Sequence, residues 1–236
     1  EYKDDNSPLT EADLKSNEII CSRLKTRYPD IPILSEENKE VAYKTRKDWE
    51  YYWCIDPIDG TKEFIKKNGE FTVNIALIHK DTPVLGVVYA PALKDIYSAK
   101  QGKGAFKNGQ KLPLQINHTP EKYLRVVASK SHLSEETQAF IDDLAGTTES
   151  IEQVSKGSSL KLCMVAEGEA DIYPRLAPTM EWDTAAAHAV VLEAGKNIYT
   201  YIDKSESLNL LLTNDDRMEI MKYNKENLLN SWFVVK

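Results

Sequence analysis

The sequence predicts an α+β chain in which helices and sheets form layers around one continuous cleft. Three observations support this fold class. Alternating apolar residues between positions 71 and 99 predict an antiparallel meander, helices and strands alternate after position 122, and acidic residues cluster at the ends of predicted elements. The length of 236 residues suits one large domain or two small ones.

The first expected helix follows Thr10, which is placed as its N-cap with Asp13 at the capping-box position. A proline at position 29 should end it. Its predicted buried face is apolar and consists of Leu14, Cys21, Leu24 and Tyr28. Residues 31–34 then predict a short strand that leads into the acidic pair Glu36-Glu37.

An aromatic strand is expected over residues 49–55, and it leads directly into Asp56. Pro57 cannot donate to a strand ladder, so we expect the chain to turn there. A half-buried strand is predicted by the alternating residues Phe71, Val73, Ile75 and Leu77. Strands at 84–89 and 96–99 follow, and the turn residues Gly102, Gly104, Asn108 and Gly109 indicate further hairpins, which completes an antiparallel meander.

Three helices are predicted in the second half of the chain. One covers residues 133–144 behind Ser131 or Ser134 as its cap, and a second covers 158–167 before a glycine. A third at 182–194 is apolar nearly all round and should be buried. With a soft boundary near 117–122, residues 1–119 form an N-terminal α+β lobe with the meander, and residues 120–236 form a C-terminal α/β lobe. The two lobes make one catalytic unit.

The bulk composition excludes several function classes. A net charge of −7 argues against a polymeric nucleic acid partner, so an anionic substrate would need metal ions or a few local cations. No apolar run approaches the roughly 18 residues of a membrane span, and no signal-peptide pattern is present. Cys21, Cys54 and Cys163 lack disulfide or zinc spacing, which predicts reduced packing thiols in a cytoplasmic protein. Because the chain opens at Glu1 and not at methionine, targeting by a preceding segment stays open.

The most informative segment runs from Asp56 to Thr61, with the sequence Asp-Pro-Ile-Asp-Gly-Thr. Asp56 and Asp59 can converge on one hard cation, and the Ile58 carbonyl can point to the same place. Oxygen ligands of this kind suit Mg²⁺, which usually shares them with a substrate phosphate. A helix at 62–67, begun by Gly60 and Thr61, would offer free amides to that phosphate.

Further carboxylates can complete this cluster. Glu36 or Glu37, at the end of the preceding strand, could supply a third, and Asp183, at the start of the buried helix, a fourth. Taken singly, each has an ordinary interpretation: Asp59 and Asp183 as helix caps, and the glutamates as solvated charge. Their joint occurrence in this order favours a catalytic metal site.

At this point the sequence resembles the inositol monophosphatase superfamily. Two segments match its signatures: Asp56-Pro57-Ile58-Asp59-Gly60-Thr61 and Glu181-Trp182-Asp183-Thr184-Ala185-Ala186. Further segments resemble the subgroup of CysQ-type 3'(2'),5'-bisphosphate nucleotidases: 5–13, 56–65, 68–77, 157–163, 173–175 and 223–229. The resemblance runs nearly end to end. It implies the layered αβαβα sandwich of the inositol monophosphatase and fructose-1,6-bisphosphatase type.

The resemblance also implies roles, position by position. The implied metal ligands, for two or three Mg²⁺ ions, are Glu36, Asp56, the Ile58 carbonyl, Asp59 and Asp183. Water activation falls to Asp13, Glu36 and Thr61. Substrate binding falls to Asp59, Gly60, Thr61, His132, Ser158, Lys161, Arg175 and Asp183. The implied reaction is in-line attack of water on the 3'-phosphate of 3'-phosphoadenosine 5'-phosphate, a small nucleotide bisphosphate, and the implied inhibitor is lithium.

Competing interpretations remain open at this stage. The same metal site could serve an inositol-1-phosphatase or a fructose-1,6-bisphosphatase, if Lys161 and Arg175 are merely solvated and His132 only caps a helix. A haloacid-dehalogenase phosphatase is disfavoured because its two aspartates are two residues apart, whereas Asp56 and Asp59 are three apart. A non-catalytic binding protein is disfavoured because every proposed ligand is present. The sequence leaves open the oligomeric state, the number of metals and any preference for a sulfated nucleotide.

Three features depart from the subgroup pattern. The first helix of the family is absent ahead of Asp4-Asp5, and the sequence leaves open whether an N-terminal helix is missing from this chain. Residues 203–221 are longer than expected between the last strands. Residues 179–181, which lead into Trp182-Asp183, fall where the subgroup varies.

Overall fold

The computed structural model describes residues 8–114, 123–128, 133–201 and 218–236. Its helices are α1 (Glu11–Arg27), α2 (Tyr43–Arg46), α3 (Thr61–Lys66), α4 (Glu135–Ala145), α5 (Leu160–Glu167) and α6 (Glu181–Glu193). Its strands are β1 (Ile33–Ser35), β2 (Tyr51–Asp59), β3 (Thr72–His79), β4 (Thr82–Ala90), β5 (Asp95–Lys100), β6 (Gly104–Lys107), β7 (Gln110–Lys111), β8 (Leu124–Ala128), β9 (Ile151–Ser155), β10 (Tyr173–Arg175), β11 (Ile198–Thr200) and β12 (Phe233–Val235). Ser131, His132, the 117–122 boundary and most of residues 203–221 lie outside the described residues.

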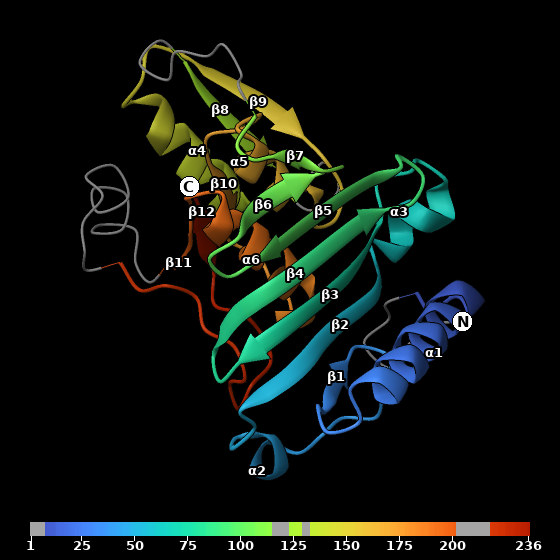
Figure 1. Ribbon diagram of the computed structural model, residues 1–236. Coiled ribbons are helices and arrows are strands. Elements are labelled where there is room, and N and C mark those ends of the chain that lie inside the picture. Colours follow the sequence, from blue (N-terminus) through green and yellow to red (C-terminus); the bar gives the residue numbers. More distant parts are fainter. Residues whose placement is uncertain (1–7, 115–122, 129–132, 202–217) are drawn as a thin grey trace.

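A seven-stranded sheet takes its strands in chain order from β1 to β7 (Figure 1). Strand β1 pairs with β2 in parallel, and every later neighbour is antiparallel, so the predicted meander is confirmed. The expected turn at Pro57 is wrong, because β2 continues to Asp59. Asp56 pairs with Asn74 and Asp59 with Thr72, so β2 carries one extra residue there. A bulge tolerates the proline because the ladder is already interrupted at that point.

The two faces of this sheet pack against different helices. Tyr52, Cys54, Ala76 and Ile78 belong to the main core together with the alanines of α6. The alternate residues Trp53 and Ile55 pack with Cys21 of α1 on the opposite face. Helix α6 lies very close to β4, since a Cβ atom built at Gly86 would lie 2.1 Å from the Ala186 carbonyl oxygen. Only glycine permits this approach.

The C-terminal strands form a second β layer behind α5 and α6. Strands β10, β12 and β11 pair in that order, β8 pairs with β9, and a bridge joins Val126 to Ile172. Phe233 and Val235 of β12 face the main core, whereas Val234 faces Phe140 of α4 on the far side. The order is therefore α1, sheet, α5 and α6, sheet, α4, as Figure 1 shows. The predicted αβαβα layering is confirmed.

The caps of two helices are as predicted, but the buried face of α1 is not. Thr10 caps α1 in a capping box with Asp13, and Ser134 caps α4. However, Leu14 is 47% exposed, and the buried residues of α1 are Asp13, Asn17 and Cys21. This face is polar because it meets the polar end of β1, where the Ser35 hydroxyl donates to Asn17 at 2.7 Å.

Two further expectations can be compared with the structure. All three cysteines are free and buried, as predicted. Within the described ranges, no helix has both the length and the apolar character needed to cross a bilayer.

Candidate active site

Three of the predicted metal ligands lie together where β2 ends and α6 begins. Asp56, Asp59 and Asp183 each offer a carboxylate oxygen, and these oxygens all lie within 4.8 Å of one another. Asp56 is buried and the other two are half-buried. A set made only of carboxylate oxygens suits a hard divalent cation such as Mg²⁺.

The electrostatics of this cluster also favour a bound cation. Burial raises the pKa of Asp56 well above its ordinary value, and the charges of Glu36, Asp59 and Asp183 raise it further. Burial, followed by the charge of Asp59, raises the pKa of Asp183 to about 8. Crowded carboxylates cannot all ionise at neutral pH without a compensating cation. The cluster therefore fits a divalent metal.

Glu36 and Ile58 lie on the β2 side of this cluster. The Glu36 amide donates to the Ile55 carbonyl at 3.1 Å, and its side chain hydrogen-bonds Asp56, although it is outside the group of three carboxylates. The carbonyl of Ile58 accepts the Thr61 hydroxyl at 3.2 Å. The same hydroxyl is 3.3 Å from Asp13 Oδ1, so Asp13 and Thr61 are neighbours although 48 positions separate them.

Asp59 does not cap the following helix, as its ordinary interpretation would require. The N-cap of α3 is Gly60, in a left-handed conformation, and no side chain caps that helix. Asp59 Oδ2 instead accepts two hydrogen bonds of 2.6 Å, from the amide and from the hydroxyl of Ser159. The side chains of Thr72 and Asn74 lie 3.4 Å from the same oxygen. Sequence reasoning missed these three residues.

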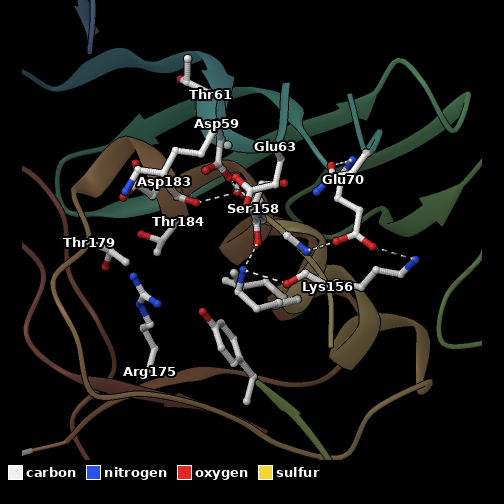
Figure 2. A pocket seen from close by; sticks show the side chains of 18 of the residues that line it. Asp59, Thr61, Glu63, Glu70, Lys156, Ser158, Arg175, Thr179, Asp183 and Thr184 are labelled. Carbon is white, nitrogen blue, oxygen red and sulfur yellow. Dashed lines mark hydrogen bonds and ion pairs between the residues drawn. The ribbon is translucent and has the colours of Figure 1, made fainter. Parts of the chain in front are cut away.

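A cavity of about 260 Å³ opens beside the carboxylates, as Figure 2 shows. This size suits a small metabolite. Of the predicted site residues, those lining it are Asp59, Gly60, Thr61, Ser158, Lys161, Arg175 and Asp183. Asp183 both lines the cavity and caps its own helix, because its Oδ2 accepts the Met180 amide at 2.8 Å.

The cationic side chains of Lys161 and Arg175 also line the cavity. Lys161 is only 6% exposed, and burial lowers its pKa to about 8, so it is not a solvated surface lysine. Its Nζ donates to the Ser158 carbonyl at 2.8 Å. Arg175 donates from Nη2 to the Pro178 carbonyl at 3.1 Å, while its buried Nε has no partner among the residues that the structure describes.

The loop before α5 is pressed against the start of β3. Ser158 has a φ of 45°, in the left-handed region, and a Cβ built at Gly157 would lie 2.6 Å from the Glu70 carbonyl. Glu70 Oε2 accepts the Gly157 amide at 2.9 Å, and Lys156 lies 3.9 Å from the other oxygen of Glu70. Figure 2 shows Glu70 and Lys156 side by side at this edge of the cavity.

Comparisons with known proteins identify relatives that match most or all of this chain. The model of the inositol monophosphatase family matches residues 1–230. The 3'(2'),5'-bisphosphate nucleotidase CysQ of Salmonella typhimurium is 48% identical over 203 residues, which cover 86% of this chain and 80% of that protein. The protein of that name from Haemophilus influenzae is 37% identical over 241 residues, covering 100% of this chain and 82% of its own.

Solved structures show the same fold. The crystal structure of CysQ from Bacteroides thetaiotaomicron matches with a TM-score of 0.85 at 43% identity, covering 99% of this chain and 86% of that one. Inositol monophosphatase II from Staphylococcus aureus matches with a TM-score of 0.73 at 22% identity, covering 95% and 79%. The second likeness concerns the fold alone.

Proposed function

The chain belongs to the inositol monophosphatase family, and within it we propose that it acts as a metal-dependent 3'(2'),5'-bisphosphate nucleotidase. Its substrate is 3'-phosphoadenosine 5'-phosphate, from which water releases inorganic phosphate and AMP. One observation carries this proposal: Asp59 and Asp183, two of the three convergent carboxylates, line the same metabolite-sized cavity as the cationic side chains of Lys161 and Arg175. A single-phosphate substrate would need only the first group.

The metal site is formed by Glu36, Asp56, Asp59, Asp183 and the carbonyl of Ile58. These oxygens suit two or three Mg²⁺ ions, which supply positive charge at the phosphoryl oxygens and lower the pKa of bound water when present. Negatively charged side chains alone would repel the substrate, whose phosphates carry the same sign.

Proton handling falls to the contact between Thr61 and Asp13. The Thr61 hydroxyl faces Asp13 Oδ1 at 3.3 Å, so the carboxylate can accept its proton while the hydroxyl oxygen accepts one from water. Glu36, beside Asp56, orients the same water. The amides that begin α3 at Gly60 and Thr61 hold the phosphoryl oxygens as the charge on them grows.

The second phosphate is held by Ser158, Lys161 and Arg175. Arg175 retains an unpaired Nε in the described part of the chain, and Lys161 is a compact cation in a buried place. His132 completes this group in our proposal, although it lies outside the described residues. The buried free thiols suit a reducing compartment, and we place the enzyme in the cytoplasm.

The direct test is release of inorganic phosphate by the purified chain. We expect turnover of 3'-phosphoadenosine 5'-phosphate in Mg²⁺, loss of turnover in a chelator, and recovery when Mg²⁺ is returned. Inositol 1-phosphate serves as the comparison substrate and should be used with much lower kcat/KM. Equal or better use of inositol 1-phosphate would reject the nucleotidase assignment, and turnover that survives chelation would reject the metal mechanism.

A further inference from the structure

Ser159 and Asn74 occupy the space directly behind Asp59, and neither contributes to the chemistry described above. Both side chains are 1% exposed. The Ser159 amide and hydroxyl each lie 2.6 Å from Asp59 Oδ2. Asn74 Nδ2 lies 2.8 Å from the Ser159 hydroxyl oxygen and 3.4 Å from Asp59 Oδ2. These three donor groups form one buried layer against a single carboxylate oxygen.

This layer also connects the two ligands that come from distant parts of the chain. The Ser159 hydroxyl oxygen is 2.7 Å from the Asp183 carbonyl, at the start of α6, as well as 2.6 Å from Asp59 at the end of β2. Its single hydrogen is best given to the carboxylate, since a charged acceptor makes the stronger bond. The Ser159 side chain therefore lies between Asp59 and the first turn of α6, with its hydroxyl bonded to the carboxylate.

The Asn74 side chain is oriented so that its amide group donates toward Asp59. Its amide nitrogen faces the carboxylate and the serine, while its Oδ1 is buried without a partner among the described residues. An unsatisfied buried oxygen is unfavourable. Keeping an asparagine at this place is therefore best explained by its donor group.

We propose that Ser159 and Asn74 are positioning residues that saturate Asp59 Oδ2 and so leave Oδ1 directed to the metal. This inference rests on the proposed function, because it concerns how one metal ligand is held. Donors behind a ligating side chain orient it, and their loss typically weakens metal binding by about 10- to 100-fold. Neither residue acts on the nucleotide in this proposal.

The test measures metal binding without substrate. Mn²⁺ replaces Mg²⁺ as the probe, and its free concentration is followed by electron paramagnetic resonance. Ser159→Ala removes the hydroxyl but keeps the amide, and we expect about tenfold weaker Mn²⁺ binding, with kcat largely restored by excess Mg²⁺. Asn74→Ala should weaken Mn²⁺ binding about threefold, and it carries the test alone if Ser159→Ala does not fold. The matched control is Ser155→Ala, since the Ser155 hydroxyl is buried without a partner in the described ranges.

The outcomes separate this inference from the proposed function. If the folded variants bind Mn²⁺ within twofold of the wild-type chain, the positioning role is wrong while the nucleotidase assignment stands. If Ser155→Ala weakens Mn²⁺ binding as much as Ser159→Ala, the effect is a nonspecific loss of stability of the fold, and the inference is wrong. If the wild-type chain binds no Mn²⁺ and does not turn over, the proposed function fails and this inference fails with it.

Discussion

The cavity has two walls that handle buried charge in opposite ways. The acidic wall presents Asp59 and Asp183, with the buried Asp56 behind them, and oxygens of these three carboxylates lie within 4.8 Å of one another. The basic wall consists of Lys161 and Arg175, each of which donates to backbone carbonyls nearby. Burial, followed by mutual repulsion, raises the pKa of Asp56 and of Asp183, whereas burial, together with the charge of Arg175, lowers the pKa of Lys161.

This difference separates the tasks of the two walls. The acidic wall is unfavourable unless a cation compensates it, so its arrangement is explained by metal binding and by the reaction. The side chains of the basic wall are held by hydrogen bonds to backbone carbonyls, so this wall can bind an anion before any metal binds. We therefore expect changes on the acidic wall to abolish turnover and changes on the basic wall to alter substrate choice.

The largest effect should come from the acidic wall. Asp59→Asn replaces an anionic ligand with a neutral one of the same shape, and we expect kcat to fall by roughly 10³-fold or more. Turnover of 3'-phosphoadenosine 5'-phosphate at saturating Mg²⁺ measures the loss, and urea unfolding checks the fold. Asp142→Asn, on the exposed side of α4, is the matched control and should behave as wild type. Activity within tenfold of wild type would remove Asp59 from the metal site.

His188, a titratable side chain buried in the core, provides a comparison for the pKa shifts on the two walls. His188 lies on α6 with Nδ1 3.0 Å from the Tyr223 hydroxyl and Nε2 3.0 Å from Asn197 Oδ1. Burial lowers its pKa from 6.5 to about 4, so the folded protein keeps it neutral. As pH falls below 6.5 the unfolded chain takes up this proton first, and roughly 3 kcal/mol of stability is lost by pH 4.

The measurement for His188 is the free energy of unfolding between pH 7 and pH 4. The contribution is fully present above the unfolded pKa and disappears as pH falls through the folded one. His188→Gln, which has no titrating ring, should lower stability at pH 7 and flatten the slope over this window. An unchanged slope in that variant would show that the core does not exclude charge and would weaken the contrast with the two walls.

The layers of the fold could be predicted from the sequence because they follow from local patterns. Period-two alternation identified the meander, Thr10 was predicted as a cap, and Ser134 was one of two candidate caps. The buried face of α1 was predicted wrongly, since apolar Leu14 is exposed and polar Asn17 is buried. Burial there is decided by the polar end of β1, a neighbour that the helix sequence does not reveal.

The site could be predicted only in part for a similar reason. Asp56, Asp59 and Asp183 are chemically distinctive and sit in recognisable motifs. Asn74 and Ser159 are ordinary polar residues 85 positions apart, and their contact depends on the tertiary fold. The bulge at Pro57 was also missed, because a proline predicts a broken ladder without saying whether the chain turns.

The basic wall should govern discrimination between substrates. We expect Lys161→Met and Arg175→Ala to lower kcat/KM for 3'-phosphoadenosine 5'-phosphate by about 10- to 100-fold, the loss of a charge-assisted contact of about 1.5–3 kcal/mol. Inositol 1-phosphate should lose much less, because it has no second phosphate. The ratio of the two kcat/KM values in each variant is the measurement. If both substrates fall together, these residues serve the metal site or the fold.

The smallest effect should come from the contact between Glu70 and the loop before α5. Glu70 accepts the Gly157 amide at 2.9 Å and so holds the loop that presents Ser158 to the cavity. Glu70→Gln can keep an acceptor but loses the charge that strengthens the bond, a change of about 1 kcal/mol. Because the loop contributes to binding and not to the reacting phosphate, we expect KM to rise about fivefold, in line with that free energy, with kcat unchanged. The exposed Glu169→Gln is the control. A fall in kcat at constant KM would instead connect this loop to the acidic wall, and the division of tasks between the two walls would not hold.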